Sequence, residues 1–209
     1  HLAVDAVSWR ILVEDLRTAY EGGELGEKGT SVRQWAEALS DRARRRDDSY
    51  WDGVQVPVPA MLQQEHDPRE VEIVVPPETT ERIVHECPRF LRTGLHEFLL
   101  TAFARALRDV TGADEFGIVL EGHGREDIAA DLDITRTVGW FSSLYPCLVR
   151  TSDSAVDSLV SVKEAVRSIP SGGIDYGVSV GYDRSLPPVC FNFLGQLDDG
   201  ADRLWGITD

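Results

Sequence analysis

Residues 95–120 read LHEFLLTAFARALRDVTGADEFGIVL, and this stretch decides the fold class. Its apolar residues recur every three to four positions as far as Val110, which is typical of one face of a helix. Gly112 follows at once and favours the left-handed backbone that ends many helices. The next apolar run, Phe116 to Leu120, is short and indicates a buried strand that ends at Glu121. A helix that leads into a buried strand predicts an α/β or α+β domain.

The rest of the chain continues this mixture of helices and strands. The expected helices are residues 8–20, 31–39, 78–86, 95–110 and 155–169, and the expected strands are 70–75, 116–120, 144–150 and 189–194. Prolines interrupt regular structure between residues 49 and 68. We therefore place a boundary there, between residues 1–67 and residues 68–209.

Charge and cysteine content exclude several classes of protein. A formal net charge of −15 over 209 residues argues against nucleic-acid binding, because neutralising phosphates needs clustered Lys and Arg. The one dense basic run, Arg42 to Arg46, is flanked by acidic residues and is expected to be a solvated helix face. Three widely spaced cysteines form no disulfide framework, which favours the reducing cytoplasm. No apolar run approaches the ~20 residues of a membrane span.

The common signatures of catalytic sites are missing from the sequence. It contains neither a GxSxG elbow for a serine hydrolase nor a GxxxxGK[ST] phosphate loop. The histidines and cysteines lack the spacing of zinc ligands. Function must therefore be sought in less common patterns.

Five polar segments are candidates for chemistry. Residues 121–126, EGHGRE, place carboxylates, an imidazole and a guanidinium around two glycines, directly after a buried strand. Strand ends are where α/β folds usually hold their functional groups, although this segment alone fits a structural role equally well. The spacing of His1 and Asp5 alone favours a structural role. Asn192 lies inside an apolar strand and needs hydrogen-bond partners if it is buried. The remaining two segments are 136–146, RTVGWFSSLYP, and 169–177, IPSGGIDYG.

Taken in order, these segments resemble the epimerization domains of nonribosomal peptide synthetases. EGHGRE is intact, and so is RTVGWF at residues 136–141; together these motifs separate epimerization domains from ordinary condensation domains. His1 and Asp5 match the second His and the Asp of the HHxxxDxxSW motif. Residues 96–102 stand where the family has a DxLLxA-like helix, with Glu97 in place of the usual Asp. Phe193 departs from the family's FNYLG pattern, which has Tyr there.

The resemblance implies a fold. Epimerization domains belong to the condensation-domain superfamily, whose α/β fold consists of two chloramphenicol acetyltransferase-like lobes, each a two-layer α+β sandwich. Residues 1–67 would then be the end of the N-terminal lobe, carrying the HxxxD part of the first motif. Residues 68–209 would form the C-terminal lobe. Most of the N-terminal lobe precedes the second His in this family and is not part of this sequence.

The resemblance also implies an activity, that of an isomerase acting on an aminoacyl or peptidyl thioester. His1 and Glu121 would remove and return the α-proton on opposite faces through an enolate, converting L to D. Asp5 would pair with Arg125 to hold the His-bearing loop, and Asn192 would orient the substrate or bind the enolate oxygen. The substrate would arrive on the 4′-phosphopantetheine arm of an upstream carrier domain, and a downstream condensation domain or module would receive it. The family uses no metal and no cofactor of its own.

Two other functions stay open at this point. A condensation domain of the same superfamily would form a peptide bond with the same His, although EGHGRE and RTVGWF argue against it. A catalytically inactive domain of this fold would bind carriers without chemistry, which Phe193 in place of Tyr leaves open.

Overall fold

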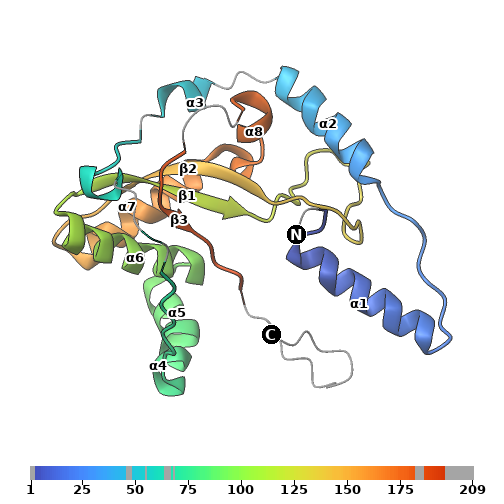
Figure 1. Ribbon diagram of the computed structural model, residues 1–209, viewed down its shortest axis with the longest axis horizontal. Coiled ribbons are helices and arrows are strands. Elements are labelled where there is room, and N and C mark those ends of the chain that lie inside the picture. The colour runs from blue at the N-terminus through green and yellow to red at the C-terminus, as the bar shows by residue number, and fades with distance from the viewer. Residues whose placement is uncertain are drawn as a thin grey trace.

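A three-stranded sheet lies at the centre of the fold (Figure 1). The computed structural model describes residues 3–45, 49–54, 56–63, 67, 69–181 and 186–195. Strand β1 (Glu115–Gly122) pairs antiparallel with β2 (Ser143–Arg150) and parallel with the two-residue β3 (Cys190–Phe191), which gives the order β2-β1-β3. The long β1–β2 ladder therefore makes up most of the sheet.

Helices supply the rest of the regular structure. They are α1 (Ala6–Tyr20), α2 (Val32–Arg45), α3 (Ser49–Gly53), η1 (Ala60–Gln63), α4 (Pro77–Glu81), η2 (Arg82–Glu86), α5 (Cys87–Leu91), α6 (Leu95–Thr111), α7 (Ala155–Ser168), η3 (Pro170–Gly173) and α8 (Tyr176–Ser179). Here η1 and η3 are short 3₁₀ helices and η2 is a π-helical turn. None of these helices is long and apolar enough to cross a membrane.

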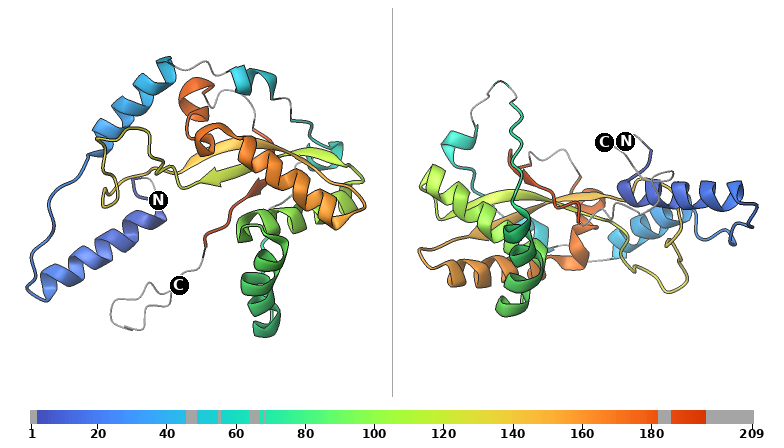
Figure 2. Two further views of the ribbon diagram at one scale, coloured as in Figure 1. Left: turned by 180° about the vertical axis from the view of Figure 1, so that it is seen from behind. Right: turned by 90° about the horizontal axis from the view of Figure 1, so that it is seen from below.

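The main core lies between the sheet and the pair of helices α6 and α7, which pack side by side (Figure 2). Phe116, Ile118 and Leu120 point to this side of β1 because side chains alternate along a strand, and all three are fully buried. Leu100 of α6 and Val162 of α7 pack against the same cluster. Burying each such side chain contributes about 1.5–3 kcal/mol, so this layer fixes β1 in place.

The helix boundaries follow local signals in the sequence. Gly112 ends α6 with a left-handed backbone, φ +71°, and its N–H donates to the carbonyl of Arg108. At the start of α2, Ser31 Oγ accepts from the backbone N–H of Gln34 while the Gln34 side chain accepts from Ser31 N. This reciprocal capping satisfies backbone groups that a helix start leaves unpaired, and the helix predictions at 8–20, 31–39, 95–110 and 155–169 are confirmed.

The predicted strand at residues 70–75 is wrong. This segment forms no ladder, and Val71 and Ile73 are 79% and 80% exposed. Its β-branched alternation fits a half-buried strand, but no strand among the described residues hydrogen-bonds to it, and a strand cannot form without a partner. Strand β3 is also shorter than the predicted 189–194, because only Cys190 and Phe191 pair with β1.

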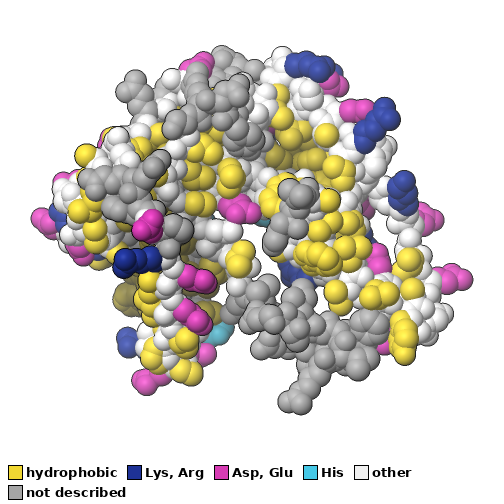
Figure 3. Space-filling model, viewed as in Figure 1, with side chains coloured by type: hydrophobic (Ala, Val, Ile, Leu, Met, Phe, Trp, Pro, Cys, Tyr) yellow, Lys and Arg dark blue, Asp and Glu magenta, His cyan; other side chains and the backbone are white. Residues whose placement is uncertain are grey.

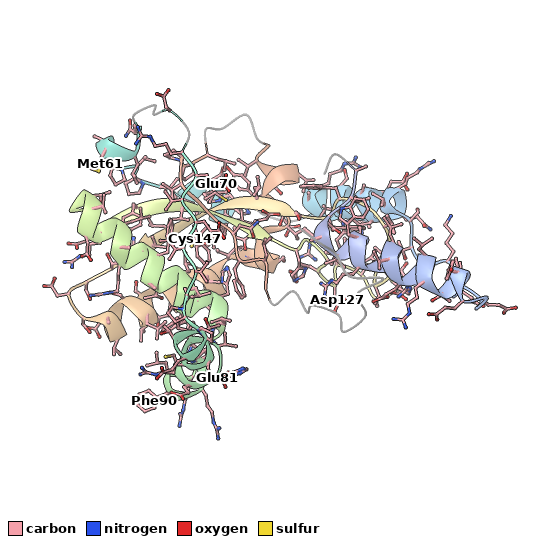
Figure 4. The ribbon with its side chains drawn as sticks, turned by 60° about the horizontal axis from the view of Figure 1, so that its bottom comes forward. Met61, Glu70, Glu81, Phe90, Asp127 and Cys147 are labelled. Carbon is pink, nitrogen blue, oxygen red and sulfur yellow. The ribbon has the colours of Figure 1, made fainter. Side chains whose placement is uncertain are left out.

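The helix predicted at 78–86 is longer than expected and leaves the body of the molecule. It runs through α4, η2 and α5 to Leu91, where Arg92 adopts a left-handed conformation. Figure 4 shows Glu81 and Phe90 on this projection, well away from Cys147 at the sheet. Among the described elements of the body, α6 contacts this segment through α5, and Lys163 of α7 donates to the carbonyl oxygen of Arg92.

Helices α1 and α2 lie at the opposite end of the molecule from α6 and α7 (Figure 1). One face of α1 carries exposed apolar residues at helical spacing, among them Trp9, Leu12 and Leu16. Figure 3 shows hydrophobic side chains gathered on this side of the molecule. The division into lobes at residue 67 stays a prediction.

Candidate functional site

Glu121 sits at the end of β1, on the face of the sheet opposite the core. It pairs with Leu144 in the β1–β2 ladder, and Leu120 before it is buried towards α6 and α7, so alternation turns the Glu121 side chain the other way. Asn192, just after β3, donates from Nδ2 to Glu121 Oε2 at 2.7 Å. Among the described residues, no other group hydrogen-bonds to this half-buried carboxylate.

The loop after Glu121 needs its glycines. Gly124 has φ +65°, and a Cβ built there would lie 1.6 Å from the carbonyl oxygen of Phe141. A Cβ on Gly122 would come within 3.2 Å of both the Tyr145 ring and the carbonyl oxygen of Gly172. Only glycine permits the approach at Gly124, and a side chain at Gly122 would require its neighbours to shift. The loop therefore lies close against the RTVGWF segment and the η3 turn.

Arg125 reaches from this loop to the start of α1. Its Nη2 lies 3.1 Å from Asp5 Oδ1 and 3.2 Å from Oδ2, and the side chains of Arg125 and Asp5 are only 10% and 5% exposed. Its Nη1 donates to the carbonyl oxygens of Ile134 and Thr137, each at 2.9 Å. The guanidinium carbon stacks 4.1 Å above the centre of the Phe141 ring. The pairing expected from the resemblance is thus present.

Asp5 also caps helix α1. Its carboxylate accepts from the backbone N–H of Ser8 at 2.8 Å and from that of Phe141 at 3.3 Å. Burial tends to raise the pKa of Asp5, but the hydrogen bonds from Ser8 and the hydrogen bond and charge of Arg125 outweigh it and lower this pKa below its ordinary value. The carboxylate is therefore ionised at neutral pH, and its hydrogen bonds are made to groups of the protein itself.

The RTVGWF segment is tied to α1 through its backbone. The N–H of Gly139 donates to Ser8 Oγ at 3.0 Å, and the N–H of Asp5 donates to the carbonyl oxygen of Gly139 at 3.1 Å. A Cβ on Gly139 would lie 2.4 Å from the Val32 side chain of α2. The start of α1, the EGHGRE loop and the RTVGWF segment thus meet around Asp5, Ser8 and Arg125.

The segment 169–177, which contains η3, is held by helix α2. Arg42 donates from Nη2 to Ser171 Oγ at 2.5 Å and from Nε to Asp175 Oδ1 at 3.1 Å, and Asp175 is 1% exposed. The basic run was expected to be a solvated helix face. That holds for Arg44, which pairs with Asp41 on the surface, but not for Arg42, and Arg46 lies outside the described residues.

Asn192 and Phe193, just after β3, point to opposite faces of the sheet. Asn192 reaches Glu121, whereas the Phe193 ring lies 6.4 Å from the imidazole of His96 at the start of α6. Burial lowers the pKa of His96 against the opposing effect of Glu97, so this imidazole is neutral at pH 7. Phe193 therefore packs away from Glu121, next to His96.

Sequence reasoning and structure differ at a few positions of the site. His1 lies outside the described residues, so its distance to Glu121 is not given by this structure. Ser8 and Arg42 had no predicted role. Asp is favoured as the residue that caps a helix start and bonds to the N–H two or three positions later, so Asp5 itself was a signal that could have found Ser8. Among the described residues no group of three His, Cys, Asp or Glu side chains could hold a metal ion.

Comparison with known proteins identifies the family. The family model of the condensation domain matches residues 1–183, which include every predicted site residue except Asn192. The chain belongs to the condensation-domain family. Bacitracin synthase 2 of Bacillus licheniformis is 38% identical over 95% of this chain, and N-(5-amino-5-carboxypentanoyl)-L-cysteinyl-D-valine synthase of Penicillium chrysogenum is 34% identical over 94%. The chain covers only 9% and 6% of these two synthases.

Solved structures confirm the condensation-domain fold. The epimerization domain from the third module of tyrocidine synthetase B is 30% identical with a TM-score of 0.70, over 91% of this chain and 48% of that one. The cyclization-docking bidomain of EpoB from Sorangium cellulosum has a TM-score of 0.68 at 20% identity, over 93% of this chain and 44% of that one, which shows the fold alone. The prediction of a chloramphenicol acetyltransferase-like α/β fold, of which this chain is a part, is confirmed.

Proposed function

We propose that the complete domain containing this chain inverts the α-carbon of an aminoacyl or peptidyl thioester. The observation that carries the proposal is the position of Glu121. Its carboxylate lies at a strand end on the face of the sheet opposite the core, with one oxygen bound to Asn192 and no further partner among the described residues. The likeness to an epimerization domain at 30% identity and the intact EGHGRE and RTVGWF motifs support this reaction over others of the family.

Inversion needs a base on one side of the α-carbon and an acid on the other. The α-proton of a thioester is acidic for a carbon acid, because the resulting anion spreads onto the carbonyl oxygen as an enolate. Glu121 would remove or return the proton on one face and His1 on the other. Each group could contribute roughly 10²–10⁴-fold as a general acid or base.

The surrounding residues would position these two groups. Asp5 and Arg125 would fix the start of α1, and with it the direction from which the chain leads back towards His1. Asn192 would act on Glu121 itself, because it already donates to that carboxylate and so restricts its rotation. The role expected from the resemblance, orienting the substrate or binding the enolate oxygen, stays a proposal beside it. Phe193 lies beside His96, so the missing phenol would not have stood next to Glu121.

The enzyme would be an isomerase working inside a larger synthase. Family members act on substrates tethered to the phosphopantetheine arm of a carrier domain and use no cofactor of their own. We propose that an upstream peptidyl carrier domain presents the substrate here and that a downstream condensation domain or module receives the product. The 1–67 and 68–209 segments would then belong to the two lobes between which the arm enters.

The proposal is tested with the complete protein and its carrier loaded with an L-aminoacyl or peptidyl thioester in D₂O. Deuterium should appear at the α-carbon and the D-isomer should accumulate. Glu121→Gln keeps the shape of the side chain but removes the base, so inversion should slow by about 10² or more. Glu115→Gln, at the exposed start of the same strand, is the matched control and should leave the rate unchanged. Full inversion in the Glu121→Gln variant would rule out the mechanism.

A second function, condensation, is favoured by one observation: the matching family model is that of the condensation domain. The two functions differ in substrates, because condensation needs a second carrier with an acceptor amine. Offering two loaded carriers to the complete protein separates them. A new peptide bond without α-proton exchange would establish condensation, and binding of the carrier with neither product would indicate an inactive domain.

A further inference from the structure

The loop behind Glu121 is fixed by a second set of contacts, centred on His123. The backbone N–H of Arg125 donates to Nδ1 of His123 at 3.0 Å, and Nε2 of His123 lies 3.3 Å from Oε1 of Glu126. The two nitrogens of this ring therefore face two groups of the same loop, the Arg125 backbone and the Glu126 carboxylate. Both ring nitrogens thus contact groups of the loop itself.

Glu126 in turn lies against the η3 turn. Gly172 has φ +59°, and a Cβ built on it would come 2.8 Å from Oε1 of Glu126. The carbonyl oxygen of the same Gly172 is the atom that a Cβ on Gly122 would approach. A single residue of η3, Gly172, therefore lies close to both ends of the 121–126 loop, at Gly122 and at Glu126.

The η3 turn has its own anchor. Arg42 of α2 bonds to Ser171 within the turn and to the buried carboxylate of Asp175 just after it. The contacts form a continuous path from α2 through η3 to the loop that starts at Glu121. A movement of the 121–126 loop would therefore break the contact between His123 and Glu126 or shift the η3 turn. That turn is held by the ion pair between Arg42 and the buried Asp175.

We propose that His123 and Glu126 are positioning residues that fix the direction of the Glu121 carboxylate by holding its loop on η3. This inference rests on the proposed function of Glu121 as a base. A base must lie within hydrogen-bond reach of the α-proton, and a misplacement of about 1 Å can cost roughly 10²-fold in rate. Neither side chain touches the reacting carbon, so their loss lowers kcat and leaves KM for the loaded carrier unchanged.

The kinetic test uses the complete protein with its loaded carrier. His123→Ala and Glu126→Ala should each lower kcat by about ten- to a hundredfold, with KM and the inflections of the pH–rate profile as in the wild type. The double variant should be no slower than the worse single variant, because both residues act through one contact. His123→Asn, whose side-chain oxygen can still accept from Arg125 N–H, should recover part of the rate and serves if His123→Ala does not fold.

A second measurement is independent of activity. Amide hydrogen exchange without substrate should show residues 121–126 and 170–174 losing protection together in His123→Ala, Glu126→Ala or His123→Asn, by about tenfold. Unchanged protection overturns the proposal, as do unchanged kcat, a double variant whose loss is the product of the two single losses, or a limb missing from the pH–rate profile of His123→Ala. A wild-type protein that exchanges no α-proton refutes the proposed function instead. Amide hydrogen exchange alone then tests whether His123 and Glu126 hold the loop on η3.

Discussion

Removing the guanidinium of Arg125 should destabilise the protein strongly, because it leaves a buried carboxylate without its counter-charge. Asp5 is 5% exposed and cannot recover its hydration when Arg125 becomes Ala. Breaking a buried ion pair from one side costs about 3–5 kcal/mol. Asp5 keeps the donors Ser8 and Phe141, which places the expected loss near the lower end, at about 3 kcal/mol.

The assay is urea unfolding of the complete protein, from which the free energy of unfolding is extrapolated to zero denaturant. Arg136→Ala is the matched control, because Arg136 also pairs with two carboxylates, Glu14 and Asp15, but is 48% exposed. Surface pairs contribute about 0–1 kcal/mol, so the control should change little.

A double variant distinguishes the cost of leaving the Asp5 charge unpaired from the cost of losing the other contacts of Arg125. Arg125→Ala combined with Asp5→Asn leaves no unpaired charge, so it should be less destabilised than the sum of the two single variants. The reasoning would be refuted if Arg125→Ala lost no more stability than Arg136→Ala. Additive losses in the double variant would refute it as well.

Two further predictions follow from the pKa shifts. The pKa of Asp5 is lower in the folded than in the unfolded protein, so its contribution to stability is present above the unfolded value of about 3.9 and disappears as pH falls through the folded value. Acid titration of unfolding should therefore show a stability loss below about pH 4 that Asp5→Asn lacks; identical curves would contradict this. Burial raises the pKa of Cys147 to about 12, whereas Cys190 is exposed and its pKa is raised only in part by burial and by Glu121, so iodoacetamide at pH 8 should modify Cys190 before Cys147, as read by mass spectrometry. Equal labelling of Cys147 in the folded protein would contradict it.

The sequence alone predicted those elements whose signals are local. The stripe from Leu95 to Val110 and the stop at Gly112 specify α6 without reference to the rest of the chain, and the apolar run before Glu121 specifies β1. Motif order also pointed to the family, because EGHGRE and RTVGWF are short patterns of adjacent residues. These predictions succeeded because hydrophobic period and turn chemistry act within a few residues.

Only the tertiary structure decided the features that depend on distant partners. Residues 70–75 have the composition of a strand, but a strand exists only where a neighbour supplies hydrogen bonds, and none of the described strands does. Arg42 belongs to a basic run whose sequence predicts a solvated helix face. Its helix nevertheless packs so that Arg42 pairs with the buried carboxylate of Asp175. Asn192 approaches Glu121 only because β3 pairs in parallel with β1, across 71 residues of sequence. Local sequence sets what each segment can become, and packing between distant segments sets which side chains meet.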